Sequence, residues 1–182
     1  MLMALMLGLL TVPGGKNSSL AKENGYVINL DRAEKLEKMT YSSLFSKAGI
    51  IVLEDTDESL LGKVDKLEVC DNNLYVLEKG RGLFLFNKQG KFIKMIGRQG
   101  KGPGEYIDPD DISIDRENKK IYVLDSQTQN VLKYSGNGTF ESSFKLENKG
   151  TRSTFIQPFK NALYTNLYTF DKSGKRFLLS KV

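Results

Sequence analysis

The apolar positions from Ile50 onward fall into short runs that are separated by turn-forming residues. Val, Ile, Leu, Phe and Tyr dominate the runs, and Asn, Asp, Gly and Lys occupy the gaps between them. Short runs between turn signals predict consecutive β-strands. Two of the runs, Leu74–Leu77 and Leu83–Phe86, are apolar at successive positions rather than at alternate ones. Strands of this kind are expected in sheets that are covered on both faces.

The strand pattern repeats along the chain. Tyr75 and Tyr122 occupy the same place in two similar units and lie 47 residues apart. The turn glycines Gly90 and Gly138 lie 48 residues apart, so two separate landmarks agree on the period. A third, weaker and shorter copy covers residues 155–177. The internal repeat is the main indication of the architecture.

A period in the mid-forties that holds four short strands is typical of a β-propeller blade. We therefore predict an all-β fold, a partial β-propeller of consecutive four-stranded antiparallel blades with a short N-terminal helix. The predicted segments are an apolar signal-like stretch and flexible tether at 1–25; an N-terminal strand, helix and edge strand at 26–62; blade 1 and a crossover loop at 63–107; blade 2 at 108–150; and an incomplete blade 3 at 151–182.

The N-terminal region carries two further features. Met1–Leu10 is apolar apart from Gly8 and is shorter than the roughly 20 residues that span a bilayer. Its length is that of the apolar part of a signal peptide, so we interpret it as a truncated export signal; the alternative is a poorly ordered tail. Further on, Asp31 and Glu34 form a capping-box pattern, which predicts a short helix around Arg32–Met39.

Several segments resemble the NHL repeat of bacterial six-bladed β-propeller proteins. The resemblance rests on residues 108–115 (DPDDISID), 121–126 (IYVLDS) and 130–134 (NVLKY), and on the linker 96–106 (IGRQGKGPGEY). It implies an exported protein of the bacterial periplasm or cell envelope, with membrane contact only through an N-terminal signal or anchor. The chain holds about three of six blades, so we expect self-association through the uncovered outer sheets.

The composition restricts the chemistry that the chain can perform. It contains no histidine and a single cysteine, Cys70. Imidazole-dependent triads and the commonest zinc ligand are therefore absent from this sequence. Cys70 lies in an apolar run, where we predict a small buried side chain. We expect neither an enzyme nor a cofactor, and no bound metal.

The charged residues give a net charge of +5, but the lysines are scattered beside turns. Nucleic-acid readers concentrate Arg and Lys on one stripe, so the scattered lysines argue against nucleic acid as a partner. Four aspartates that suit a Ca²⁺ site, Asp108, Asp110, Asp111 and Asp115, do not follow EF-hand spacing. Capping of turns is the favoured interpretation of these carboxylates.

The segment Gly97–Glu105 has two interpretations. The favoured one is a crossover between blades, in which glycines permit left-handed backbone conformations. The other is a ligand-contact loop that uses Arg98, Lys101, Glu105 and Tyr106. In that case Arg98 would grip a carboxylate and Tyr106 would stack on a sugar or peptide. A P-loop is excluded, because no Ser or Thr follows Lys101.

These observations favour a non-catalytic binding or scaffold module that recognises a protein, peptide or glycan. Two alternatives remain at this point. One is a Ca²⁺-dependent lyase or lactonase of the NHL-like kind, with an oxygen-ligand cage in place of histidine. The other is a basic RNA-binding propeller, whose affinity would fall steeply with salt.

Overall fold

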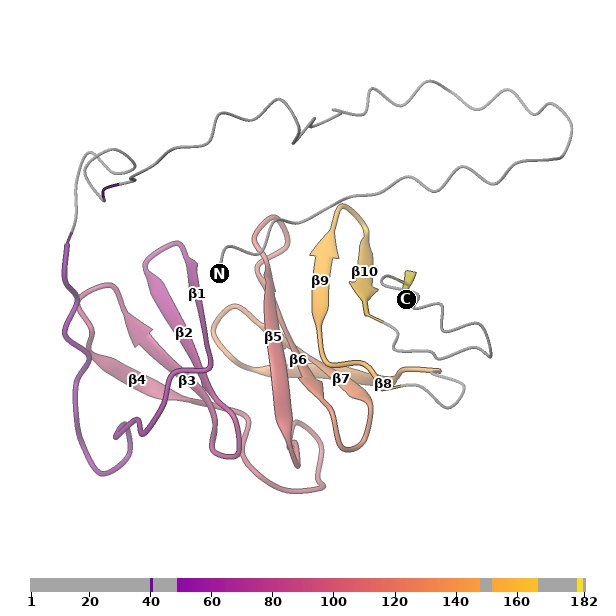
Figure 1. Cartoon of the computed structure of the whole chain (residues 1–182), viewed down its shortest axis with the longest axis horizontal. Coiled ribbons are helices and arrows are strands. Elements are labelled where there is room, and N and C mark those ends of the chain that lie inside the picture. Colours follow the sequence, from indigo (N-terminus) through magenta and orange to yellow (C-terminus); the bar gives the residue numbers. More distant parts are fainter. Residues whose placement is uncertain (1–39, 41–48, 148–151, 167–179, 182) are drawn as a thin grey trace, which may run out of the picture. The chain divides into compact units, whose positions relative to one another are not determined.

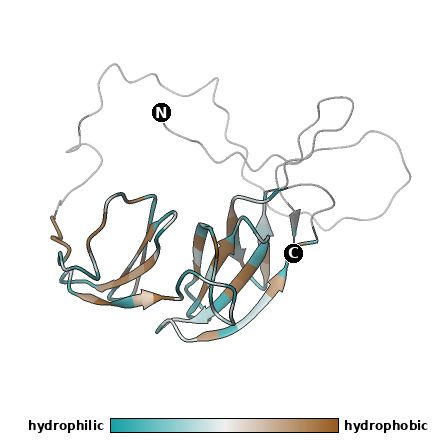
Figure 2. Cartoon of the chain, turned by 90° about the horizontal axis from the view of Figure 1, so that it is seen from below, coloured by the Kyte–Doolittle hydropathy of each residue, from teal (hydrophilic) through white to brown (hydrophobic). Residues whose placement is uncertain are grey.

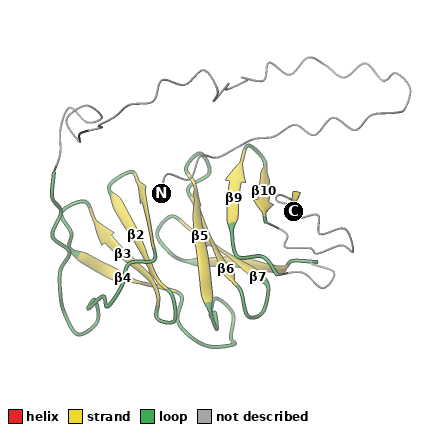
Figure 3. Ribbon diagram, in the orientation of Figure 1, coloured by secondary structure: helices red, strands yellow, loops and turns green. Residues whose placement is uncertain are grey.

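The computed structural model describes Thr40 and the residues 49–147, 152–166 and 180–181. Within these residues every regular element is a β-strand (Figure 3). The described residues contain no helix that is long and apolar enough to cross a membrane. The signal-like stretch at 1–25 and the helix predicted around Arg32–Met39 lie outside the described residues. For the described part of the chain, the all-β prediction is confirmed.

Two four-stranded antiparallel sheets follow one another along the chain (Figure 1). In each sheet the strands pair in sequence order, so that every strand lies beside its neighbour in the chain. Sheet 1 contains β1 (Lys66–Cys70), β2 (Asn73–Glu78), β3 (Gly82–Asn87) and β4 (Phe92–Ile96). Sheet 2 contains β5 (Pro109–Asp115), β6 (Lys120–Asp125), β7 (Asn130–Ser135) and β8 (Phe140–Lys145).

The third repeat forms a smaller sheet, sheet 3. It consists of β9 (Ile156–Phe159), β10 (Ala162–Thr165) and β11 (Ser180–Lys181), in the order β11-β10-β9. All of its described pairings are antiparallel. The predicted Gly174 turn of this repeat lies outside the described residues.

The turn glycines occupy equivalent hairpins between the third and fourth strands of sheets 1 and 2. Gly90 has φ of +82° and donates its amide to Asn87 O at 2.9 Å. Gly138 has φ of +80° and donates its amide to Ser135 O at 2.8 Å. Both turns need the left-handed conformation that glycine adopts without a Cβ penalty. The 48-residue spacing in the sequence therefore reflects a repeated hairpin.

The strands that are apolar at successive positions are buried on both sides. Leu77, Leu83 and Phe84 have no exposed surface. Leu77 and Leu83 face sheet 2, whereas Phe84 lies in a cluster that Leu53 and Leu61 help to cover. Figure 2 shows the apolar segments along these strands. The prediction that both faces of such strands are covered is confirmed.

Apolar clusters join each sheet to the next. Tyr75 and Leu85 of sheet 1 share a cluster with Ile112 of sheet 2, and Cys70 is buried in it as predicted. A second cluster joins sheet 2 to sheet 3 and contains Leu124, Val131, Ile156 and Leu163. The first strands lie side by side, since β1 contacts β5 and β5 contacts β9. Sheet 2 thus presents one face to sheet 1 and the other to sheet 3.

One carboxylate links the three first strands. Asp111 of β5 accepts a hydrogen bond from Lys66 Nζ of β1 at 2.8 Å and another from Ile156 N of β9 at 2.8 Å. Lys66 Nζ also lies 5.5 Å from the centre of the Phe155 ring. Burial raises the pKa of Asp111, and the ion pair with Lys66 opposes that rise. A buried carboxylate is costly unless it is paired, so these contacts fix the sheets to one another.

The described strands form an open succession of sheets with four, four and three strands. None of these sheets is closed into a propeller. The repeat predicted the strands and their stacking, but closure of a ring depends on contacts between distant sheets, which a local repeat does not specify. The structure therefore supports the all-β, four-stranded antiparallel part of the prediction.

Candidate functional site

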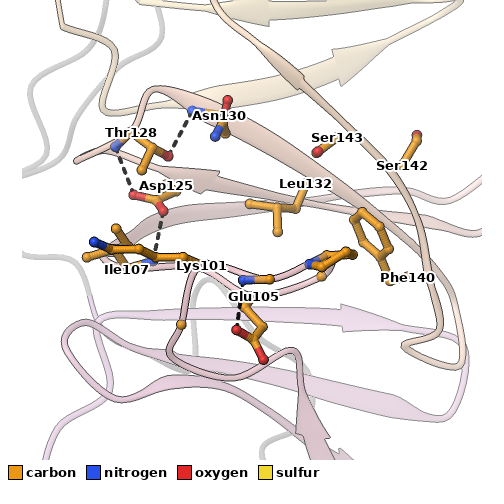
Figure 4. Close-up of a pocket in the computed structure, with 14 residues that line it drawn as sticks. Lys101, Glu105, Ile107, Asp125, Thr128, Asn130, Leu132, Phe140, Ser142 and Ser143 are labelled. Atoms are coloured by element: carbon orange, nitrogen blue, oxygen red, sulfur yellow. Dashed lines mark hydrogen bonds between the residues drawn. The ribbon is translucent and has the colours of Figure 1, made fainter.

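A cavity of about 700 Å³ lies between sheet 2 and the crossover loop, residues 97–108, which connects β4 to β5 (Figure 4). We refer to it as the loop cavity. The crossover loop contributes Gly100, Lys101, Gly102, Pro103, Gly104, Glu105 and Ile107. Sheet 2 and its turns contribute Asp125, Thr128, Asn130, Leu132, Phe140, Ser142 and Ser143.

Asp125 fastens the crossover loop to sheet 2. It lies at the end of β6, and its carboxylate accepts hydrogen bonds from Ile107 N at 2.8 Å and from Thr128 N at 3.1 Å. Only 2% of Asp125 is exposed, although it borders the cavity. Ser126 N donates to Asp108 O at 3.0 Å beside this contact. Aspartate is favoured in turns because its side chain accepts nearby amides, and here it also accepts from the incoming loop.

Glu105 holds the crossover loop in shape from within. Its carboxylate accepts hydrogen bonds from Gly102 N at 2.8 Å and from Arg98 Nε at 2.6 Å. These bonds, that from the Gly102 amide first, lower the pKa of Glu105 below its ordinary value. Two of the predicted contact residues are thus brought together as an ion pair. Arg98 in this arrangement is engaged by Glu105 rather than free to grip a ligand carboxylate.

Lys101 is the predicted contact residue that suits ligand binding best. Its side chain is exposed and borders the loop cavity. Among the described residues it has no ion-pair partner within 4.0 Å, in contrast to Arg98. An unpaired ammonium at the mouth of a cavity can donate to ligand oxygens.

Tyr106 occupies the core rather than the surface of the loop. It has no exposed surface, and its hydroxyl accepts a hydrogen bond from Leu83 N at 3.1 Å and donates to Ile96 O at 3.0 Å. Burial raises the pKa of Tyr106 to about 12. The ring therefore has no free face on which a sugar or peptide could stack, and this part of the expected ligand contact is corrected. The side chain satisfies two backbone groups of sheet 1 instead.

An aromatic side chain forms the wall of the cavity opposite the loop. The Phe140 ring packs edge-on against Tyr134, with ring centres 5.8 Å apart. A Cβ on Gly104 would lie 2.9 Å from Phe140 Cβ, and Gly104 has φ of +74°. Tyr134 Oη donates to Gly104 O at 3.1 Å. The loop therefore approaches this wall as closely as only glycine allows.

The four aspartates of the predicted acidic cluster have separate roles. Asp115 accepts hydrogen bonds from Asn118 N and Asn118 Nδ2, at 3.0 and 2.8 Å, and caps the turn between β5 and β6. Asp108 accepts a hydrogen bond from Ser126 Oγ at 3.1 Å, Asp110 pairs with Lys79 at 2.7 Å, and Asp111 pairs with Lys66. The turn-capping interpretation is correct for Asp115. In the described part of the chain, no three acidic or cysteine side chains are grouped in a way that could hold a metal ion.

The sequence did not indicate the contribution of β8. Ser142 and Ser143 border the loop cavity, but they lie some 40 residues from Lys101 in the chain. The available signal was the polar run that follows Phe140, because it interrupts an otherwise apolar repeat. Which face of β8 turns toward the loop depends on strand register, and register is not evident from this run.

Comparisons with known proteins agree with an all-β chain and give no activity. A family model described as "Domain of unknown function (DUF4934)" matches residues 25–178. The crystal structure of a "putative exported protein" from Bacteroides fragilis NCTC 9343 is similar in fold, with a TM-score of 0.62 and 27% sequence identity. The match covers 71% of this chain and 38% of that chain, so this chain spans about two fifths of the relative's length. No curated protein matches.

The resemblance to the NHL repeat is overturned by these findings. The family that matches is a different one, and the similar structure carries no NHL description. The segments at 108–115 and 121–126 that suggested NHL repeats form β5 and β6 of an ordinary antiparallel sheet. Short strands with Asp-rich turns are common to many all-β folds, so this strand pattern does not identify the NHL repeat.

Proposed function

Since the chain belongs to the DUF4934 family, which prescribes no activity, we propose its function from its own site: a non-catalytic binding module of an exported protein. The loop cavity would receive the ligand, a glycan or a segment of peptide or protein. Export is supported by the similar structure from Bacteroides fragilis, a protein described as exported. The cavity between sheet 2 and the crossover loop is the observation that carries the proposal, since binding sites are concave and few.

The lining of the loop cavity suits a neutral polar ligand. Ser142, Ser143 and Asn130 provide hydroxyl and amide groups, and Phe140 provides a ring beside them. Hydrogen-bonding groups near an aromatic face are the combination that recognises sugars and extended peptides. The carboxylates of the lining are already occupied, Asp125 by amides and Glu105 by Arg98. Only Lys101 adds an unpaired charge.

The shape of the cavity is set before any ligand arrives. Asp125 fixes one end of the crossover loop, and Glu105 fixes its turn. The Gly104 contact with Phe140 fixes its distance from β8. A site that is already ordered loses little conformational entropy on binding, which favours recognition over the induced closure seen in many enzymes.

The arrangement of the sheets supports a finer proposal about the fold. We propose that the three sheets are consecutive radial units, with β1, β5 and β9 innermost. The contacts β1–β5 and β5–β9, and the Asp111 link among these strands, support this order. Loops at one end of such units would then gather around the loop cavity, which is where binding residues concentrate on repeat folds.

The proposal is tested by direct binding to the full chain. Neutral oligosaccharides and extended peptides are titrated while backbone amide shifts are recorded by NMR. We expect one ligand class to shift Ser142, Ser143 and Gly102 together, and the Phe140→Ala variant to weaken its binding at least ten-fold. Asn137→Ala is the matched control, because Asn137 borders a separate cavity of about 470 Å³ at the turns Asp71–Asn73 and Ser135–Gly138. Binding that Phe140→Ala leaves unchanged would refute the site.

A further inference from the structure

The two interfaces between sheets use the same position of the repeat. Leu67, Ile112 and Ile156 each pair with the residue that follows the tyrosine of their own repeat. They therefore occupy equivalent places in the first strands β1, β5 and β9. Ile112 packs against sheet 1, and Ile156 packs against sheet 2. In both cases the side chain points toward the preceding sheet.

Among the described residues, no sheet lies in front of the equivalent face of sheet 1. Ile112 and Ile156 are fully buried, whereas Leu67 is 52% exposed. Two residues further along the strand, Ile114 is 6% exposed and its equivalent Val69 is 45% exposed. We refer to Leu67 and Val69 as the leading face. Leu67 and Val69 are thus exposed at positions where Ile112, Ile156 and Ile114 are buried in the later repeats.

The rest of this side of sheet 1 is already covered. Val76 and Phe84 are buried in a cluster to which Leu53 and Leu61 contribute. Glu54 N donates to Gly90 O at 2.7 Å, which attaches the covering segment to the β3–β4 turn. The cover reaches β2, β3 and β4 but leaves β1 bare.

The far side of sheet 3 has a matching exposed patch. Phe159 is 60% exposed, and its ring lies 6.4 Å from that of Tyr164, edge to face. Tyr164 occupies the same position of the repeat as Tyr75 and Tyr122, and those two tyrosines pack in the clusters between sheets. We refer to Phe159 and Tyr164 as the trailing face. In sheets 1 and 2, the surface equivalent to the trailing face covers the first strand of the following sheet.

We propose that the leading face binds the trailing face of a second copy of this chain, so that the molecules associate head to tail. The contact would repeat a third time the interface that occurs twice within the chain, between sheets 1 and 2 and between sheets 2 and 3. It is a heterologous interface, in which two different surfaces meet and which closes into a ring or continues as a chain. Burial of the exposed apolar side chains supplies its driving force.

The proposal is tested on the full chain by sedimentation equilibrium. Leu67→Glu and Phe159→Glu each place a charge in one of the two faces. Ile93→Glu is the matched control, since Ile93 is 49% exposed on β4 and belongs to neither face. We expect wild type and Ile93→Glu to associate equally, and each face variant to raise the dissociation constant at least ten-fold.

An equimolar mixture of the two face variants decides the geometry. One copy keeps an intact trailing face and the other an intact leading face, so the mixture is expected to form 1:1 dimers that neither variant forms alone. A mixture that associates no better than its components overturns the head-to-tail arrangement. Wild type that stays monomeric to about 100 μM overturns the proposal as a whole, because the leading face then binds no second copy at that concentration.

Folding is checked for each variant by circular dichroism, and Leu67→Ser replaces Leu67→Glu should the latter unfold. This inference rests on the outer sheet faces and not on the loop cavity. The face variants are therefore expected to retain ligand binding, and Phe140→Ala is expected to retain association. The two proposals can fail separately.

Discussion

Lys66 Nζ lies 2.8 Å from Asp111 Oδ1, although the two residues occupy the same position in consecutive repeats. A repeat that carried the same residue at both places would set two like charges against each other. The sequence avoids this by alternating the sign of the charge, and by placing Phe155 at the third equivalent position. The contact between the first strands of sheets 1 and 2 thus depends on the differences between repeats.

Removal of Lys66 is expected to destabilise the chain. Asp111 is buried, so Lys66→Met leaves its carboxylate with the Ile156 amide but without its ion-pair partner. We expect a loss of about 2–4 kcal/mol in the free energy of unfolding at pH 7, measured in urea.

The pH dependence of that loss identifies Asp111 as its cause. The folded-state pKa of Asp111 is raised, so the stability linked to its protonated form is present at low pH and is lost as pH rises through the folded pKa. Without Lys66 the pKa rises further. The difference between wild type and Lys66→Met should therefore grow from pH 4 to pH 7, and an equal difference at both would contradict this account.

Loss of the Glu105 charge is expected to loosen the crossover loop. Hydrogen bonds from Gly102 and Arg98 lower the pKa of Glu105, so its contribution is present at neutral pH and is lost as pH falls through the lowered pKa. Glu105→Gln should lower Tm by roughly 1–3 °C at pH 7. Differential scanning fluorimetry should show the two proteins converging as the pH falls through the lowered pKa of Glu105, below which both side chains are neutral.

Tyr106→Phe removes one oxygen atom but is expected to lower the free energy of unfolding through two lost hydrogen bonds. The change leaves Leu83 N and Ile96 O buried without a partner, which costs about 2–3 kcal/mol in total. Urea unfolding at pH 7 measures this loss. Ultraviolet titration gives an independent check, because Tyr106 should ionise only near pH 12, and Tyr106→Phe should remove that late transition. A cost below about 0.5 kcal/mol would show that water replaces the hydroxyl.

Gly104 and Gly80 form a matched pair for the cavity wall. Both adopt positive φ, +74° and +81°, but only Gly104 has a side chain, Phe140, within 3 Å of the position of an added Cβ. Gly80→Ala should cost about 1 kcal/mol from backbone strain. Gly104→Ala should cost about 1–2 kcal/mol more and should also shift the Phe140 resonances. Equal costs would mean that Phe140 moves aside freely.

The sequence indicated those parts of the fold that depend on local pattern. Successive apolar residues predicted burial of Leu74–Leu77 on both sides, and the spacing of Gly90 and Gly138 predicted two equivalent hairpins. The position of Tyr106 was not evident, because an aromatic residue after a glycine-rich loop can turn either outward or into the core. Gly82 leaves the space that the inward position of Tyr106 requires, since a Cβ on residue 82 would collide with the Tyr106 hydroxyl.

The candidate site was predicted only in part, because it is formed by contacts between repeats. The glycines of the crossover loop indicated a candidate ligand-contact loop, and its residues Lys101 and Glu105 do border the cavity. The opposite wall comes from β8, whose register with β7 shifts between Lys133 and Tyr134. A shift of one residue changes which side chains face the loop. No feature of residues 140–143 in isolation specifies that shift.

The hydrogen bonds of Asp125 also bear on how the molecule would respond to force. The crossover loop leaves sheet 1 at Ile96, and the side chain that secures its far end belongs to sheet 2. Tension along the backbone between the two sheets would reach the Ile107 and Asp108 amides before it reached the ladder of β5 and β6. The hydrogen bonds of the Asp125 carboxylate would therefore break before the strand ladder does. Stretching by optical tweezers should show a small early extension that Asp125→Ala abolishes.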